Sequence, residues 1–127
     1  MRVETLYKTA TPGTSVRAGE YYSLALDDPK GEMFILSELH GRWDEVEGKA
    51  IPDASDTLSP PDGYSSLEEA QAALDQRKLF RAKQGFQYCF VRDFSPDAVV
   101  DGVCQFVDVD QMGSLHAQVS GSGYTRP

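Results

Sequence analysis

The chain has 127 residues, 40% hydrophobic content and a net charge of −8, which fits one globular domain with a single core. Its apolar runs are shorter than the roughly 20 residues of a membrane-spanning helix, and the opening residues lack the apolar segment of a secretory signal. We therefore expect a cytoplasmic domain over residues 1–119 that makes no membrane contact, with a frayed tail over residues 120–127.

The acidic charge is concentrated in residues 20–62, where eleven acidic and three basic side chains give −8. Proteins bind nucleic acids mainly by neutralising phosphates with lysine and arginine, so we expect no nucleic-acid partner. A protein with a basic surface is the partner that this charge favours. A solvated acidic face would give the same sequence pattern.

The two cysteines, Cys89 and Cys104, do not belong to a motif with metal-ligand spacing. Both lie in segments of strand character, and we expect reduced, buried thiols. Asp108 and Asp110 have the spacing of the first two ligands of a calcium loop, but the later carboxylates are missing. The sequence therefore predicts no metal and no cofactor.

Residues 2–8 form the first predicted strand, and residues 9–19 form a loop rich in Thr, Pro, Gly and Ser. Residues 20–27 alternate with a period of two, which indicates a strand, and residues 33–39 return as its partner. The sequence Asp28-Pro29-Lys30-Gly31 supplies the residues of a tight turn between them. This segment predicts a β-hairpin.

Residues 40–64 contain repeated strand and helix breakers: Gly41, Gly48, Pro52, Pro60, Pro61 and Gly63. That spacing predicts a long loop, with at most a short extended piece over residues 43–51. Loops of this length are uncommon in compact domains and often carry function.

A helix is predicted from Ser66 to Gln84. Ser66-Leu67-Glu68-Glu69 is a capping box, and Gly85 is a natural helix end. Apolar residues at helical spacing form one stripe, but Arg77 falls in the middle of it. Arg77 is interpreted either as a long stem covering apolar surface or as part of an arginine pair, with Arg92, that holds an anionic ligand.

Residues 86–94 form the strongest predicted strand, with aromatic side chains on one face, and residues 103–109 are predicted to pair with it. Residues 115–119 could add a short strand. The element order is β-ββ-loop-α-ββ. The predicted fold is therefore α+β, with an antiparallel sheet of four to six strands and one main helix packed on one face.

The sequence favours a non-enzymatic binding or interaction module that uses the 40–64 segment. Trp43 would be an interface anchor with a charged rim, and the candidate binding residues are His40, Arg42, Trp43, Asp44, Glu45 and Glu47. The competing interpretation is that Trp43 packs into the core and the acidic residues are merely solvated. We assign no catalytic residues, because no nucleophile motif accompanies either histidine.

The sequence is also compatible with two other functions. One is a small enzyme that uses paired carboxylates together with His40. The other is a structural subunit that associates with itself through an exposed sheet edge. A ligand-sized pocket would favour the enzyme, and a long uncovered edge strand would favour self-association.

Overall fold

The computed structural model describes residues 2–8, 19–28, 33–44 and 46–93. The helix and strands follow in the order β1 (Arg2–Lys8), β2 (Gly19–Asp27), β3 (Ile35–Asp44), β4 (Lys49–Thr57), α1 (Leu67–Lys83) and β5 (Gln87–Asp93). The strands form one antiparallel sheet in the order β4-β3-β2-β1-β5. In the described residues, the predicted α+β class with an antiparallel sheet and one main helix is confirmed.

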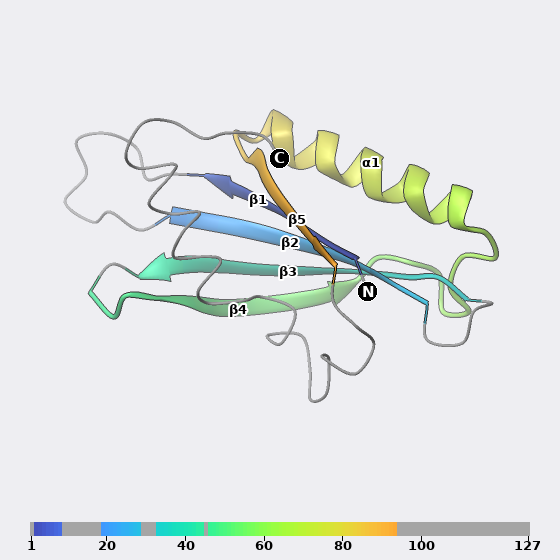
Figure 1. Cartoon of the computed structure of the whole chain (residues 1–127), viewed down its shortest axis with the longest axis horizontal. Helices are drawn as coiled ribbons and strands as arrows, with labels where there is room; N and C mark the ends of the chain where they lie inside the picture. The colour runs from blue at the N-terminus through green and yellow to red at the C-terminus, as the bar shows by residue number, and fades with distance from the viewer. Residues whose placement is uncertain (1, 9–18, 29–32, 45, 94–127) are drawn as a thin grey trace.

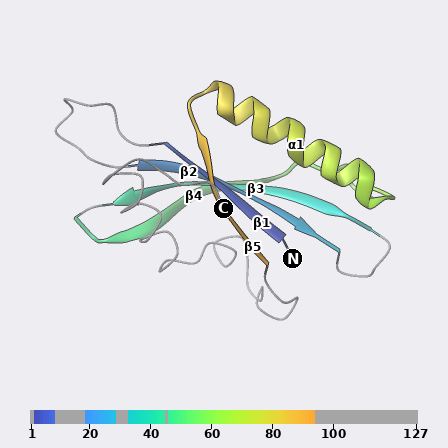
Figure 2. The ribbon, with the colours of Figure 1, turned by 45° about the horizontal axis from the view of Figure 1, so that its top comes forward.

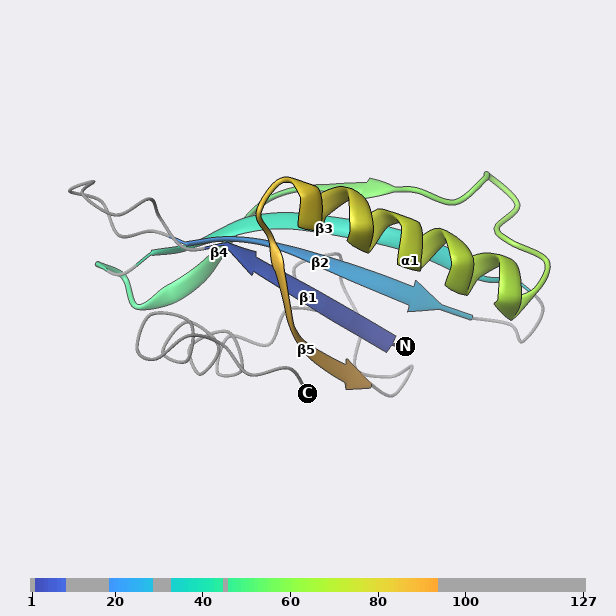
Figure 3. The ribbon, with the colours of Figure 1, turned by 90° about the horizontal axis from the view of Figure 1, so that it is seen from above.

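The helix lies across one face of a twisted sheet, above β2 and β3 (Figures 1, 2 and 3). The predicted hairpin is present, because β2 and β3 pair along their whole length. In this register Leu24 lies opposite Glu38, and Tyr22 lies opposite His40. The antiparallel pairing therefore places two polar side chains of β3 on the face that α1 covers.

The prediction of a long loop over residues 40–64 is wrong. β3 continues to Asp44, and β4 pairs back along it from Lys49 to Thr57. The Asp44 carboxylate accepts hydrogen bonds from the backbone N–H groups of Val46 and Glu47, at 2.9 and 3.3 Å, and Gly48 takes a left-handed conformation with φ of 67°. The element order is therefore β-β-β-β-α-β over the described residues.

Two residues that predicted a loop are accommodated within strands. Gly41 pairs with Pro52, and a Cβ at Gly41 would overlap the ring of Tyr21. The glycine therefore makes room for a buried aromatic side chain. Pro52 lacks a backbone N–H, but it lies in β4 at the edge of the sheet, where proline is tolerated.

The helix begins and ends as the sequence predicts. The Ser66 hydroxyl accepts a hydrogen bond from the Glu69 backbone N–H at 3.2 Å. The Glu69 carboxylate accepts from the Ser65 hydroxyl at 3.4 Å. Gly85, with φ of 96°, follows the last turn and redirects the chain into β5. These local devices fix the length of the helix above the sheet.

One hydrophobic core lies between the helix and the sheet. Its buried members are Leu6, Leu24, Leu26, Leu36, Ala70, Leu74 and Phe86. The opposite face of β1–β3 is also buried, and includes Val3, Tyr7, Tyr21, Leu39 and Trp43. Burial on both faces explains why the alternation of polar and apolar residues is weak in β1, where Glu4 and Thr5 are nearly inaccessible.

Several predictions concern residues outside the described ranges: the strands over residues 103–109 and 115–119, the tail over residues 120–127, and Cys104. Cys89 lies in β5, as predicted, at an irregularity where Leu6 pairs with Tyr88 and Thr5 pairs with Phe90. The helix that the structure describes is not long and apolar enough to cross a membrane.

Replacing Trp43 tests the packing on the face of the sheet opposite α1. Trp43 is 8% exposed, so replacing it with alanine removes a core aromatic side chain. We expect Trp43→Ala to lower the free energy of unfolding by about 3–5 kcal/mol in denaturant melts.

The matched control is Val46→Ala in the adjacent turn. Val46 is 95% exposed, so this change should stay within about 0.5 kcal/mol of the wild type. A Trp43→Ala cost of less than about 1 kcal/mol would contradict the observed burial.

Candidate functional site

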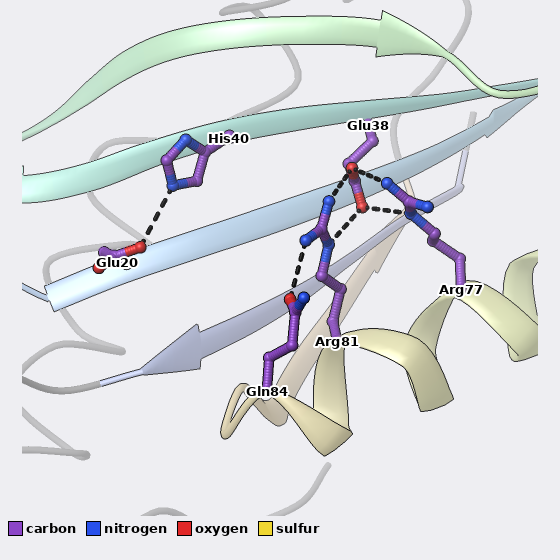
Figure 4. Close-up of polar contacts among 6 residues, drawn as sticks. All are labelled: Glu20, Glu38, His40, Arg77, Arg81 and Gln84. Atoms are coloured by element: carbon purple, nitrogen blue, oxygen red, sulfur yellow. Dashed lines mark hydrogen bonds and ion pairs between the residues drawn. The ribbon is translucent and has the colours of Figure 1, made fainter.

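Two arginines of α1 bind one buried carboxylate of β3 (Figure 4). Arg77 donates from Nε and Nη2 to the Glu38 carboxylate oxygens at 2.9 and 2.8 Å. Arg81 donates from Nε and Nη2 to the same two oxygens at 3.0 and 2.7 Å. Each guanidinium therefore binds the carboxylate with two nearly parallel hydrogen bonds, which is the strongest geometry for this pair of groups.

The charge of Glu38 is maintained by its partners. Burial raises the pKa of the Glu38 carboxyl, but the hydrogen bonds and charges of Arg77 and Arg81 outweigh burial and hold the pKa below its usual value. The same hydrogen bonds raise the pKa of Arg77. Glu38 is 3% exposed, so the carboxylate is ionised in a site from which water is largely excluded.

A second buried carboxylate lies nearby on β1. Glu4 accepts a hydrogen bond from Lys78 Nζ at 2.7 Å and one from Arg2 Nε at 3.2 Å. Glu4 and Glu38 lie on either side of Leu24 in the register of the sheet. The sheet-facing side of α1 is thus attached to β1 and β3 by ion pairs, in addition to the hydrophobic core.

Arg81 also orders the aromatic residues beside it. Its guanidinium carbon lies 3.6 Å from the ring centroid of Tyr22, which is a close cation–π contact. The Tyr22 ring stacks on His40, with centroids 4.6 Å apart and planes at 26°. It meets the Phe86 ring edge-on at 4.9 Å. A continuous set of contacts therefore runs from the buried carboxylate to His40.

His40 lies between two carboxylates from the neighbouring strands. Its Nε2 atom is 3.4 Å from Glu20 Oε2 on β2 (Figure 4), and its Nδ1 atom is 4.0 Å from Asp53 Oδ2 on β4. Asp53 is the extra residue of a β-bulge, since Gly41 pairs with Pro52 and His40 with Ala54. A bulge changes the direction in which a side chain points. Here the bulged residue, Asp53, is the one whose carboxylate lies near the imidazole.

This geometry is unsuited to holding a metal ion. The two carboxylates approach opposite nitrogens of the ring, so one ion cannot be bound by all three groups. Across the described residues, no group of three or more His, Cys, Asp or Glu side chains could hold a metal. The geometry around His40 also differs from that of a catalytic histidine, in which an orienting group binds one ring nitrogen and the other ring nitrogen faces a nucleophile.

The six candidate residues predicted from sequence do not form one surface. His40 and Arg42 lie on the helix-covered face of β3, where Arg42 Nη1 donates to Asp44 at 3.4 Å. Trp43 is buried on the opposite face, which excludes it as an exposed interface anchor. Glu47 is exposed in the turn, and Glu45 lies outside the described residues.

Sequence reasoning missed Glu38, Arg81, Glu20 and Asp53. A signal for Glu38 was present: it occupies an apolar-face position of its predicted strand, as Arg77 does in its helix. Two such residues of opposite charge are candidates to pair in the fold, because an unpaired buried charge is costly. Asp53 could not have been found this way, because its position depends on the bulge.

Among the described residues, β4 is an edge strand of the sheet. Residues 52–57 are all exposed, and in this part of the chain β4 pairs with β3 alone. The strand carries Asp53 and Asp56, and residues 50–57 contain no lysine or arginine. Glu20, on β2, lies across His40 from Asp53. We call the surface formed by Glu20, Asp53 and Asp56 the acidic edge.

Comparison with known proteins finds no matching family model, no matching curated protein and no matching solved structure. The site is therefore interpreted from its own geometry.

Glu38 makes stability depend on pH in a defined direction. Because the pKa of Glu38 is lower in the folded state than that of an ordinary glutamate, the stabilisation is present above the unfolded-state pKa and is lost as pH falls through the folded-state pKa. We expect Glu38→Gln to lower the free energy of unfolding at pH 7 by about 3 kcal/mol, and to weaken the decline of stability below about pH 4.5.

The control is Glu47→Gln, since Glu47 is exposed in the β3–β4 turn. It should change stability at pH 7 by less than about 0.5 kcal/mol. Urea melts at several pH values measure both effects. Equal stability of Glu38→Gln and wild type at pH 7 would show that the buried carboxylate is not stabilised as described.

Proposed function

We propose that the protein is a non-enzymatic binding module whose acidic edge accepts a basic, extended segment of a partner protein. The observation that carries the proposal is the exposure of β4 over residues 52–57 together with its charge. An uncovered edge strand offers backbone N–H and C=O groups to another strand, and strand addition at such an edge is a common mode of peptide recognition.

The charge of the edge favours one kind of partner. Asp53 and Asp56 lie on the strand, and Glu20 adds a further exposed carboxylate on the same face. Lysine or arginine residues at alternate positions of an added strand would lie on this side of it. Complementary charges speed the encounter and select the partner, while the backbone pairing contributes affinity.

The same features weigh against self-association through this edge. A second copy pairing its β4 with this one would bring aspartates from both chains together, and like charges across strands are destabilising. Acidic side chains on an edge strand therefore disfavour pairing between identical edges, whereas they favour a basic partner strand.

The geometry also gives less support to the alternative of an enzyme that uses carboxylates with His40. Both ring nitrogens face carboxylates, whereas a general base needs one nitrogen within reach of the proton that it removes. The ring is held by stacking on Tyr22 and by its flanking acids. These contacts support the proposal that His40 belongs to a binding surface.

A capped peptide of alternating lysine and threonine tests the proposal. In amide NMR titrations we expect saturable shift changes centred on residues 50–57, with affinity that falls as salt is added. Asp53→Asn combined with Asp56→Asn should weaken binding by about fivefold, as expected for two surface charge pairs.

Two controls define the outcome. Asp62→Asn removes an exposed acid that lies after β4, and it should leave the affinity unchanged within about twofold. A peptide of alternating glutamate and threonine should not bind. Shift changes confined to another part of the chain, or absent, would contradict the proposed function.

A further inference from the structure

The protonation state of His40 is linked to the geometry of its two neighbours. A neutral imidazole has one N–H, so it can donate to one side only, whereas an imidazolium donates from both nitrogens. Glu20 approaches Nε2 and Asp53 approaches Nδ1. The doubly protonated ring is therefore the only form that can donate to both carboxylates at once. The His40 side chain is 31% exposed, so solvent protons reach it.

Other charged groups on the helix and strands around His40 have contacts or charge interactions of their own. Arg81, from α1, is bound to Glu38. On β3, Arg42 is paired with Asp44, and on β1, Lys8 donates to the Gln84 carbonyl at 3.2 Å. On β4, the negative charge of Asp56 helps to raise the pKa of Arg77. The aromatic neighbour from β2 is Tyr22. Histidine is the only side-chain type in this set whose ordinary titration falls between pH 5 and 8.

We propose that His40 is a pH-dependent control on the acidic edge: the basic segment binds more tightly when His40 is neutral and more weakly when His40 is protonated. The inference rests on the proposed function and names its regulation. When the His40 ring is neutral, Glu20 and Asp53 present two negative charges, and at least one carboxylate is without an imidazole donor. Protonation adds a positive charge between them and draws both carboxylates into internal ion pairs across β2, β3 and β4.

The direction of the effect follows from this charge change. The summed charge of Glu20, His40 and Asp53 changes from −2 to −1 when His40 is protonated, so the attraction for a basic segment weakens as pH decreases. Lysines of the partner stay charged over the same range, because their ordinary pKa is about 10.4. The change in affinity therefore comes from the protein surface.

The test measures the dissociation constant of the alternating lysine–threonine peptide at about pH 7.5 and about pH 5.5, for wild type and His40→Gln. Wild type should bind about threefold to tenfold more weakly at the lower pH, as expected for the loss of one or two surface charge interactions. His40→Gln should change by less than about twofold, because glutamine is polar but does not titrate.

A second measurement needs no peptide and no variant. In the wild-type protein, the backbone amide of Asp53 should shift with pH at the same midpoint as the ring protons of His40, and both ring nitrogens should be protonated at the acidic end. An amide of Asp62, outside the site, is the control.

The outcomes separate the two proposals. Absence of saturable peptide binding at about pH 7.5 would overturn the proposed function and, with it, its regulation. Binding at neutral pH that is equally strong at acidic pH, or that weakens equally in His40→Gln, would overturn the regulation alone. An Asp53 amide shift that does not change at the midpoint of the His40 ring protons would also overturn the regulation.

Discussion

The attachment of the helix to the sheet depends on one charge, the carboxylate of Glu38, which is 3% exposed beneath α1. Removing a carboxylate from water costs several kcal/mol, and this cost is offset only when the geometry of the partners is nearly ideal. Arg77 and Arg81 meet that requirement with two hydrogen bonds each. Because the arginines are one turn apart on α1, the pairing fixes both the rotation of the helix and its position along the sheet.

The positions of the residues in the candidate binding surface depend on this attachment. Arg81 contacts the ring of Tyr22, Tyr22 stacks on His40, and His40 faces carboxylates on β2 and β4. A buried ion pair is weak evidence for net stability, since an apolar replacement of similar shape is often as stable. We infer that its contribution here is specificity: it selects one arrangement of helix over sheet, and with it one arrangement of the groups around His40.

Local sequence signals predicted the elements whose causes are local. The Ser66 cap and Gly85 located α1, and the alternation in residues 20–27 located β2 with its hairpin partner. The 40–64 segment was wrongly predicted to be a loop, because Gly41 and Pro52 were counted as residues that end a strand. Neither residue interrupts its strand in this fold. Gly41 gives room to Tyr21, and Pro52 lies on the edge strand. Both reasons are tertiary, so the sequence does not display them.

The candidate site was predictable to a smaller extent, since His40 was identified but its partners Glu20 and Asp53 come from other strands and one of them from a bulge. The central claim is that Glu38 holds α1 to β3 through its arginines. A double-mutant cycle on unfolding free energies, with Glu38→Gln, Arg81→Gln and the double variant, tests it most directly. The account predicts a coupling of at least about 1.5 kcal/mol. Additive effects, with a coupling below about 0.5 kcal/mol, would contradict it.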